Sequence, residues 1–250
     1  MVVIRTSREL ALMREAGRIS ANALKLAGEA VEPGVSTLEI ETIVRKYIEK
    51  EGAIPSFLGY GGFPASACIS VNDVVIHGIP SKKCILKEGD IVSVDVGAFI
   101  DGFHGDNAYT FPCGKISAEA QALLKATEES LYEGIKAAVA GNRIGDIGHA
   151  VQKYVEDRSY SVVRDFVGHG VGAKLHEDPA VPNYGTPGRG VRLMPGMTIA
   201  IEPMITAGDY KVKVLDDDWT TITVDGSLAA HFEHTVAITP DGPKILTIPD

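Results

Sequence analysis

The chain repeats itself at an offset of 107 residues, and this repeat constrains the fold more than any other feature of the sequence. GVSTLEIETIVRKYIE (34–49) can be laid on GNRIGDIGHAVQKYVE (141–156) with six identities in sixteen positions. The same offset lays LKEGDIVSVDVGA (86–98) on LMPGMTIAIEPMI (193–205), where an acid in one apolar segment meets an acid in the other. Two separate segments that agree on one offset indicate a duplicated unit.

Each half has the pattern of two helices followed by strands. Capping-box sequences at Thr6 and Ser36 predict two helix starts. No low-complexity linker separates the halves, about 1–115 and 116–250, so we expect one domain of 250 residues. Its fold class should be α/β, with the two duplicated halves packing their sheets together and helices outside. The predicted helices span 6–33, 36–52, 117–140 and 144–158, and the strands 66–71, 90–98, 103–111, 162–168, 197–206, 211–215, 219–224 and 229–238.

Charge and cysteine content exclude several classes of protein. With 24 Lys and Arg against 33 Asp and Glu, the net charge of −9 argues against a nucleic-acid-binding surface. The lysines of 82–87 form a small basic cluster, which we interpret as a solvated loop, although docking on ribosomes stays open. The three cysteines form no CxxC pair and are odd in number, which indicates a protein of the reducing cytoplasm rather than a disulfide framework. We find no signal-peptide pattern and no apolar run of membrane-spanning length.

Two aspartates stand in the segment SVDVGAFIDGFHGD (93–106), which otherwise reads as a buried hairpin. Asp101-Gly102 is a strong signal for a two-residue turn. Such a turn pairs residues whose numbers sum to 203. Because side chains alternate between faces along a strand, Asp95 and Asp106 then lie on one face as diagonal neighbours, roughly 7–8 Å apart.

Two carboxylates on a buried face repel each other, and the loss of water adds to the cost. Either one carboxyl stays protonated or a cation lies between them. The alternative is that this face of the hairpin is open to solvent, as antiparallel edges often are. The same register puts His104 on this face, and spacing alone does not exclude it as a ligand.

The second half adds histidines and acids in similar contexts. His169 and His176 stand among glycines in VGHGVGAKLHEDP, where the backbone can approach a ligand closely. Glu202 interrupts the apolar run TIAIEPMI, and Glu233 interrupts AAHFEHTVAI. Buried acids are rare without a partner. Several carboxylates with a histidine suit divalent Mn, Fe or Co, and two such ions can share bridging carboxylates.

These motifs together resemble those of the pita-bread metallopeptidases over essentially the whole chain. The ordered set of acids and histidine occurs in the contexts VSVDVGAFIDGFHGD, GHGVGAKLHEDP, IAIEPM and FEHTVAI. The similarity is closest to the bacterial type I methionine aminopeptidases. FLGYGGFPASACISVNDVVIHGIP (57–80) resembles their methionine-pocket region and includes His77.

The resemblance implies a centre for two divalent metal ions, which could be Co, Mn, Fe, Zn or Ni. Asp106 and Glu233 would bridge the two ions. Asp95 would bind one ion through both oxygens, and His169 and Glu202 would complete the other. The family has no ligand at the position of His104, so this resemblance removes the candidate that the hairpin register had left open.

The resemblance also implies catalytic and substrate-binding residues. His77 and His176 would contact the scissile peptide, and Glu202 would accept the proton of the attacking water. The chain departs from the type I pattern at Phe57, Phe63 and Leu175, which changes the expected shape of the pocket while leaving it apolar. The residues implied to line the methionine pocket are Tyr60, Phe63, Cys68, Leu175 and Trp219.

The implied activity is metal-dependent removal of the initiator methionine from nascent polypeptides whose second residue is small. We expect a cytoplasmic monomer that binds no specific nucleic acid and no membrane. One alternative is another pita-bread peptidase, a prolidase or an aminopeptidase P, although these usually carry a separate N-terminal domain. A second alternative is a non-catalytic pita-bread binding module, but such relatives lose metal ligands and here all five positions are filled.

Overall fold

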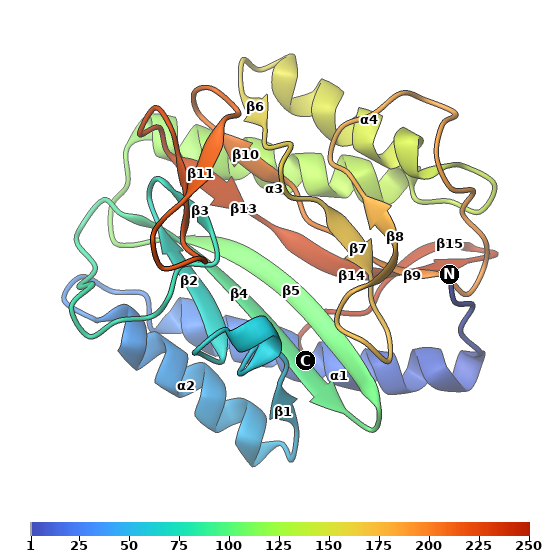
Figure 1. Ribbon diagram of the computed structural model, residues 1–250, viewed down its shortest axis with the longest axis horizontal. Helices are drawn as coiled ribbons and strands as arrows, with labels where there is room; N and C mark the ends of the chain where they lie inside the picture. Colours follow the sequence, from blue (N-terminus) through green and yellow to red (C-terminus); the bar gives the residue numbers. More distant parts are fainter. Residues whose placement is uncertain (1) are drawn as a thin grey trace.

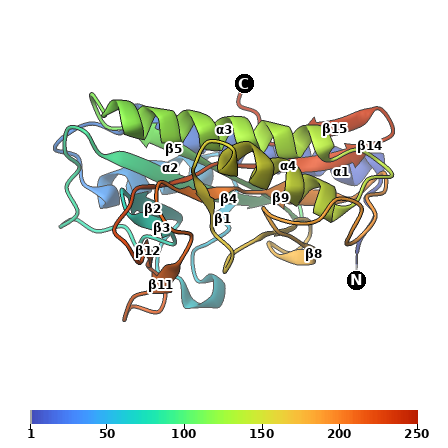
Figure 2. The ribbon, with the colours of Figure 1, turned by 90° about the horizontal axis from the view of Figure 1, so that it is seen from above.

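The computed structural model describes residues 2–250 as a mixed α/β fold. Two helix pairs lie at opposite ends of the view in Figure 1, with curved strands between them. Figure 2 shows α3 (Ala118–Ala137) on one side of these strands and the hairpin of β11 (Val212–Val214) on the other. Among the described residues, no helix combines the length and apolar character needed to cross a membrane. The helices are α1 (Ser7–Glu29), α2 (Thr37–Lys50), α3 (Ala118–Ala137), α4 (Ile144–Glu156) and the short 3-10 helix η1 (Tyr60–Gly62).

The strands form one nine-stranded sheet and two three-stranded sheets. In the large sheet the order is β1-β4-β5-β14-β9-β7-β8, with β2 also on β4 and β15 also on β14; the small sheets are β13-β10-β6 and β11-β12-β3. The bounds are β1 (Ile54–Pro55), β2 (Ala67–Val71), β3 (Val74–Ile76), β4 (Ile91–Ile100), β5 (Phe103–Pro112), β6 (Ser161–Val162), β7 (Gly168–Gly170), β8 (Glu177–Val181), β9 (Thr198–Ile201), β10 (Met204–Thr206), β11 (Val212–Val214), β12 (Thr221–Thr223), β13 (Ala229–His231), β14 (Glu233–Thr239) and β15 (Gly242–Ile245).

Both predicted capping boxes are present. The Thr6 hydroxyl accepts from the backbone N–H of Glu9, whose carboxylate accepts from the backbone N–H of Thr6. Ser36 and Glu39 make the same reciprocal pair at the start of α2. These bonds satisfy N–H groups that a helix start leaves without partners, and they explain why both helices begin where the sequence predicts.

The β4–β5 hairpin has the register that the turn signal predicts. Asp101 and Gly102 both have positive φ, 50° and 86°, as a two-residue turn of this kind requires. Across the hairpin Gly97 pairs with Asp106, so Asp95 lies diagonally opposite Asp106 on the same face. The hairpin prediction is confirmed.

Two of the predicted strands are in fact each divided in two. The segment 197–206 breaks at Glu202-Pro203, and the segment 229–238 breaks at Phe232. Pro203 has no N–H to give to a ladder, and its carbonyl instead accepts from the N–H of Phe232. The two breaks therefore lie side by side, at the place where β9 and β14 of the large sheet separate from β10 and β13 of a small one.

The predicted strand 162–168 is wrong over most of its length. Only Ser161–Val162 and Gly168–Gly170 are in strands. The intervening chain leaves the sheet, and Phe166 and Val167 turn toward a cavity instead. The two apolar pairs of this segment, Val162-Val163 and Phe166-Val167, are separated by Arg164-Asp165 and do not belong to one continuous strand.

Backbone contacts recur at the offset seen in the sequence. Ser36 forms an isolated bridge with Ile85, and 107 residues later Arg143 forms one with Arg192. The N–H of Gly34 donates to the carbonyl of Leu86, and the N–H of Gly141 donates to the carbonyl of Leu193. Both glycines have positive φ, 95° and 98°.

The two halves meet inside the large sheet, where β5 pairs with β14. Each half also has its own hydrophobic core, and α1 packs closely on the β4–β5 hairpin. At the tightest point of that contact, a Cβ on Gly105 would lie 2.4 Å from the backbone nitrogen of Gly17 and 2.5 Å from its Cα. The absence of a side chain at Gly105 is what lets the helix backbone lie on the hairpin that carries Asp106.

We predict that Gly105→Ala lowers the free energy of unfolding by about 2–3 kcal/mol, because a methyl group there must push helix and strand backbones apart. At about 2–4 °C per kcal/mol for a chain of this size, the melting temperature should fall by roughly 5–10 °C. Lys25→Ala, on the exposed side of the same helix, is the control and should stay within about 0.5 kcal/mol of the parent. An unchanged melting temperature for Gly105→Ala would contradict this prediction, because the helix and strand would then have room for a methyl group at position 105.

Candidate metal centre and active site

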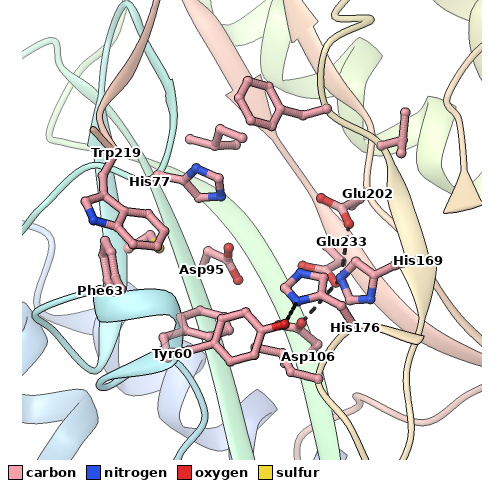
Figure 3. Close-up of a pocket in the computed structure, with 16 residues that line it drawn as sticks. Tyr60, Phe63, His77, Asp95, Asp106, His169, His176, Glu202, Trp219 and Glu233 are labelled. Carbon is pink, nitrogen blue, oxygen red and sulfur yellow. Dashed lines mark hydrogen bonds and ion pairs between the residues drawn. The ribbon is translucent and has the colours of Figure 1, made fainter. Parts of the chain in front are cut away.

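A cavity of about 210 Å³ opens beside the junction of the two halves. One wall is acidic and the other is apolar and aromatic. In Figure 3, His77, Phe63 and Trp219 lie on one side of the view and His169 and His176 on the other. The acidic residues implied as metal ligands, Asp95, Asp106, Glu202 and Glu233, all line this one cavity.

Three adjacent strands hold three of the acids on one face. Asp95 on β4 pairs with Ala108 on β5, and Glu233 on β14 pairs with Ala108 from the other side. Asp106 stands two residues before Ala108 and therefore shares its face. The small side chain of Ala108 leaves the space between the three carboxylates open. Glu202, at the break after β9, supplies the fourth acid.

His169 joins the acids from β7. Its Nδ1 lies 2.9 Å from the carbonyl oxygen of Gly170, so Nδ1–H donates there and Nε2 is left with a lone pair. Nε2 lies 3.5 Å from Glu202 Oε1 and 3.8 Å from Asp106 Oδ2. One ligand atom from each of Asp106, His169 and Glu233 can be chosen so that all three lie within 4.8 Å of one another.

Burial sets the protonation of this cluster in the metal-free chain. It raises the pKa of Asp106 to about 7, against the opposing hydrogen bond from the backbone of Asn107. The pKa values of Asp95, Glu202 and Glu233 are raised well above the usual range, first by burial and then by the neighbouring carboxylates. Burial lowers the pKa of His169 to about 3, so its imidazole is neutral.

The donor set fits a divalent metal ion. Within residues 2–250, Asp95 Oδ1, Asp106 Oδ1 and Glu233 Oε1 are buried and have no hydrogen-bond partner. Buried oxygens of this kind cost free energy unless something binds them. A cation would satisfy them and offset the mutual repulsion of the carboxylates, and a neutral imidazole beside oxygen ligands suits Mn, Fe, Co or Zn.

The apolar wall contains every residue expected in the methionine pocket. Phe63 packs edge-on against Trp219, with ring centroids 5.1 Å apart. Cys68 and Leu175 are buried in the same cluster, and Tyr60 stands at the exposed rim. The sequence did not indicate Ile76, Phe166 and Val167, which also line the cavity, because their positions depend on where distant strands end.

The two histidines implied as catalytic, His77 and His176, face the cavity from opposite sides. His77 has a positive φ of 58°, a strained backbone state that is common at functional positions. Burial lowers its pKa to about 4, so the ring is neutral. His176 Nδ1 lies 2.7 Å from the hydroxyl oxygen of Tyr60, and its ring centroid lies 4.0 Å from that of His169.

Two further histidines complete the comparison with the sequence analysis. His104 lies on the predicted face of the hairpin, but its Nδ1 is 2.9 Å from Ser56 Oγ and it does not line the cavity. Sequence reasoning missed His231, whose Nε2 lies 3.7 Å from Glu202 Oε2. Its only signal was a histidine two residues before Glu233 in an otherwise apolar segment.

Comparison with known proteins agrees with this geometry. The sequence profile of metallopeptidase family M24 matches residues 11–240. A methionine aminopeptidase of Clostridium acetobutylicum is 54% identical over 248 residues, covering 99% of each chain. The chain belongs to metallopeptidase family M24 and, within it, to the methionine aminopeptidases. The crystal structure of methionine aminopeptidase from Thermotoga maritima superposes with a TM-score of 0.97 at 48% identity, covering 99% of both chains.

More distant solved structures share the fold. A prolidase from Pyrococcus horikoshii has a TM-score of 0.81 at 24% identity, and this chain covers 65% of its length. The pita-bread fold class predicted from the sequence is therefore confirmed. The sequence identity to methionine aminopeptidases is much higher than the identity to the prolidase, so the prolidase alternative is not favoured.

We predict that the metal-free protein loses stability as the pH rises from 7 to 8.5. A carboxyl whose pKa is higher in the folded chain holds its proton there after the unfolded chain has lost it, so stability falls as pH rises through the folded pKa. Each such group contributes up to about 1.4 kcal/mol per pH unit. The buried histidines act in the opposite direction, but only below about pH 6.5, where the unfolded rings gain protons.

Thermal melts of chelator-treated protein across this range provide the measurement. Saturating Mn(II) should abolish the fall, because the ion replaces the protons. Glu233→Gln is the matched variant and should show a shallower fall without metal. A flat profile for the metal-free parent would mean that the carboxylates are already ionised and solvated.

Proposed function

We propose that this chain removes the initiator methionine from nascent polypeptides whose second residue is small, using two divalent metal ions. The observation that carries the proposal is the meeting, in one cavity, of two buried and two partly buried carboxylates and a neutral imidazole with an apolar pocket. We propose two ions rather than one because five ligand residues are more than one ion of this class ordinarily binds through side chains. Asp106 and Glu233 would bridge the ions, Asp95 would hold one, and His169 and Glu202 the other.

The pocket supports methionine as the first residue. Methionine is unbranched and flexible, and its thioether packs well against aromatic rings. Phe63, Cys68, Leu175 and Trp219 would surround it, with Tyr60 at the rim. The positively charged α-amino group of the substrate would be attracted to the acidic wall, which explains cleavage at the first peptide bond. His77, His176 and Tyr60 line the same cavity as the metal ligands, and in this proposal they limit the second residue to a small side chain.

The residues of the chain have separate roles in hydrolysis. Bound divalent ions supply Lewis acidity and lower the pKa of water. Glu202 would take the proton of the attacking water on a carboxylate oxygen and deliver it to the nitrogen of the leaving amine. The neutral rings of His77 and His176 would donate N–H bonds to the oxygen on which negative charge develops.

The remaining expectations follow from this role. Newly made polypeptides are the substrate, so we place the protein in the cytoplasm, in keeping with its free cysteines. We propose a monomer in which one catalytic domain spans residues 1–250, with duplicated halves near 1–115 and 116–250. The lysines of 82–87 are exposed, and a transient ribosome contact through them is part of the proposal.

Selectivity tests the proposed function directly. Protein loaded with Mn(II) or Co(II) should hydrolyse Met-Ala-Ser and Met-Gly peptides and leave Met-Lys and Met-Glu peptides almost intact. Free methionine is the product to measure, and a Leu-Ala-Ser peptide and an Ala-Pro dipeptide are the matched controls. Equal rates on Leu-first or Met-Lys peptides, or faster cleavage of Ala-Pro, would exclude this function. Activity is then measured after Fe(II), Mn(II), Co(II) and Zn(II) are returned separately to metal-free protein. This comparison ranks the metals by the activity that they support.

Replacement of His77 separates catalysis from metal binding. We predict that His77→Ala lowers kcat by roughly 100-fold or more, the scale of losing one donor to the developing charge. Metal content should stay at the parent value, because His77 is not among the proposed ligands. Metal analysis and circular dichroism accompany the kinetics. A parallel fall in metal content and activity would make His77 a ligand.

A further inference from the structure

His231 is a buried polar residue that the proposed reaction does not yet use. It is 2% exposed at the end of β13, and its Nε2 has no hydrogen-bond partner among the described residues. Leaving a buried polar atom without a partner costs about 1–3 kcal/mol. The Nε2 atom lies 3.7 Å from Glu202 Oε2. This separation is slightly longer than a hydrogen bond, and a small rotation of the carboxylate would close it.

The backbone of His231 is fixed from two sides. Thr110 Oγ1 accepts from the N–H of His231 at 2.9 Å and donates to its carbonyl at 2.8 Å. On the other side, β13 pairs with β10 and sets His231 opposite Met204. The backbone that carries the ring is thereby anchored to β5, the strand of Asp106, and to β10, the strand that follows Glu202. With this backbone fixed, rotation of the two side chains alone would close the gap.

The two oxygens of Glu202 face different histidines. Oε1 lies 3.5 Å from His169 Nε2, the atom left free to bind metal. Oε2 lies on the side of His231. A carboxylate has two oxygens, so one can bind the metal while the other accepts a hydrogen bond.

We propose that His231 is a positioning residue, whose Nε2–H donates to Glu202 Oε2 and so holds Oε1 toward the metal site shared with His169. This inference rests on the proposed role of Glu202 as a ligand and proton acceptor. Groups that orient a metal ligand typically affect metal affinity or activity by 10–100-fold. His231 would act only through Glu202 and would touch neither the substrate nor the metal.

The test compares His231→Met with His231→Gln. Both side chains are unbranched and of similar volume, but only Gln keeps an N–H donor. We expect His231→Met to lower kcat for Met-Ala-Ser by about 10–100-fold with KM within about twofold, and to weaken binding of one metal ion in calorimetry. His231→Gln should recover most of both losses. The visible absorption of bound Co(II) should change in His231→Met and return toward the parent in His231→Gln.

Two outcomes would overturn the inference. In the first, His231→Met binds metal and turns over like the parent, or loses only metal-free melting temperature. In the second, the Gln and Met variants are equally impaired although both fold. His231→Leu replaces His231→Met if the latter does not fold. If the parent fails to cleave Met-Ala-Ser, the proposed function fails, while metal affinity and the Co(II) spectrum still decide whether His231 orients Glu202.

Discussion

Four carboxylates withdrawn from water at one wall of a cavity are the constraint on which the rest of this structure depends. Burial raises the pKa values of all four carboxyls, and neighbouring carboxylates raise those of Asp95, Glu202 and Glu233 further, so the chain cannot hold them all ionised without a cation. The fold nevertheless holds three of them on adjacent strands and Glu202 directly after the end of β9, where they line the cavity. Metal binding removes the repulsion between the carboxylates and also forms bonds to the ligands. Both effects contribute to the free energy of metal binding.

Interruptions of the strands, rather than the strands themselves, bring the last acids into place. Pro203 ends β9 and Phe232 separates β13 from β14, and the carbonyl of Pro203 accepts from the N–H of Phe232. Glu202 and Glu233 each stand beside one of these breaks. The diverging strands leave a gap that side chains do not fill, and the cavity opens there. Local loss of sheet regularity is thus a requirement of the site.

Sequence reasoning reached the first half of this centre by geometry alone. The Asp101-Gly102 turn sets the register of β4 and β5, and the register places Asp95 diagonally to Asp106. It did not reach the second half in the same way, because the breaks at Pro203 and Phe232 depend on contacts between distant strands. The apolar pattern of 162–168 concealed the turn of Phe166 toward the cavity for the same reason. The roles assigned to His169, Glu202 and the pocket residues came from resemblance, and they remain proposals.

The proposed duplication accounts for the metal centre better than for the substrate pocket. Asp95 and Glu202 stand at equivalent positions 107 residues apart, and each would bind a different ion, so the two halves contribute alike to the metals. The pocket has no such symmetry: η1 and the segment up to His77 come from the first half, and Trp219 and the His169–His176 segment come from the second. A symmetric pair of halves can provide two similar metal sites, but a single peptide bond has a different group on each side. The loops of the two halves differ and make the pocket asymmetric, while the shared sheet keeps the carboxylates of both halves at one wall of the cavity.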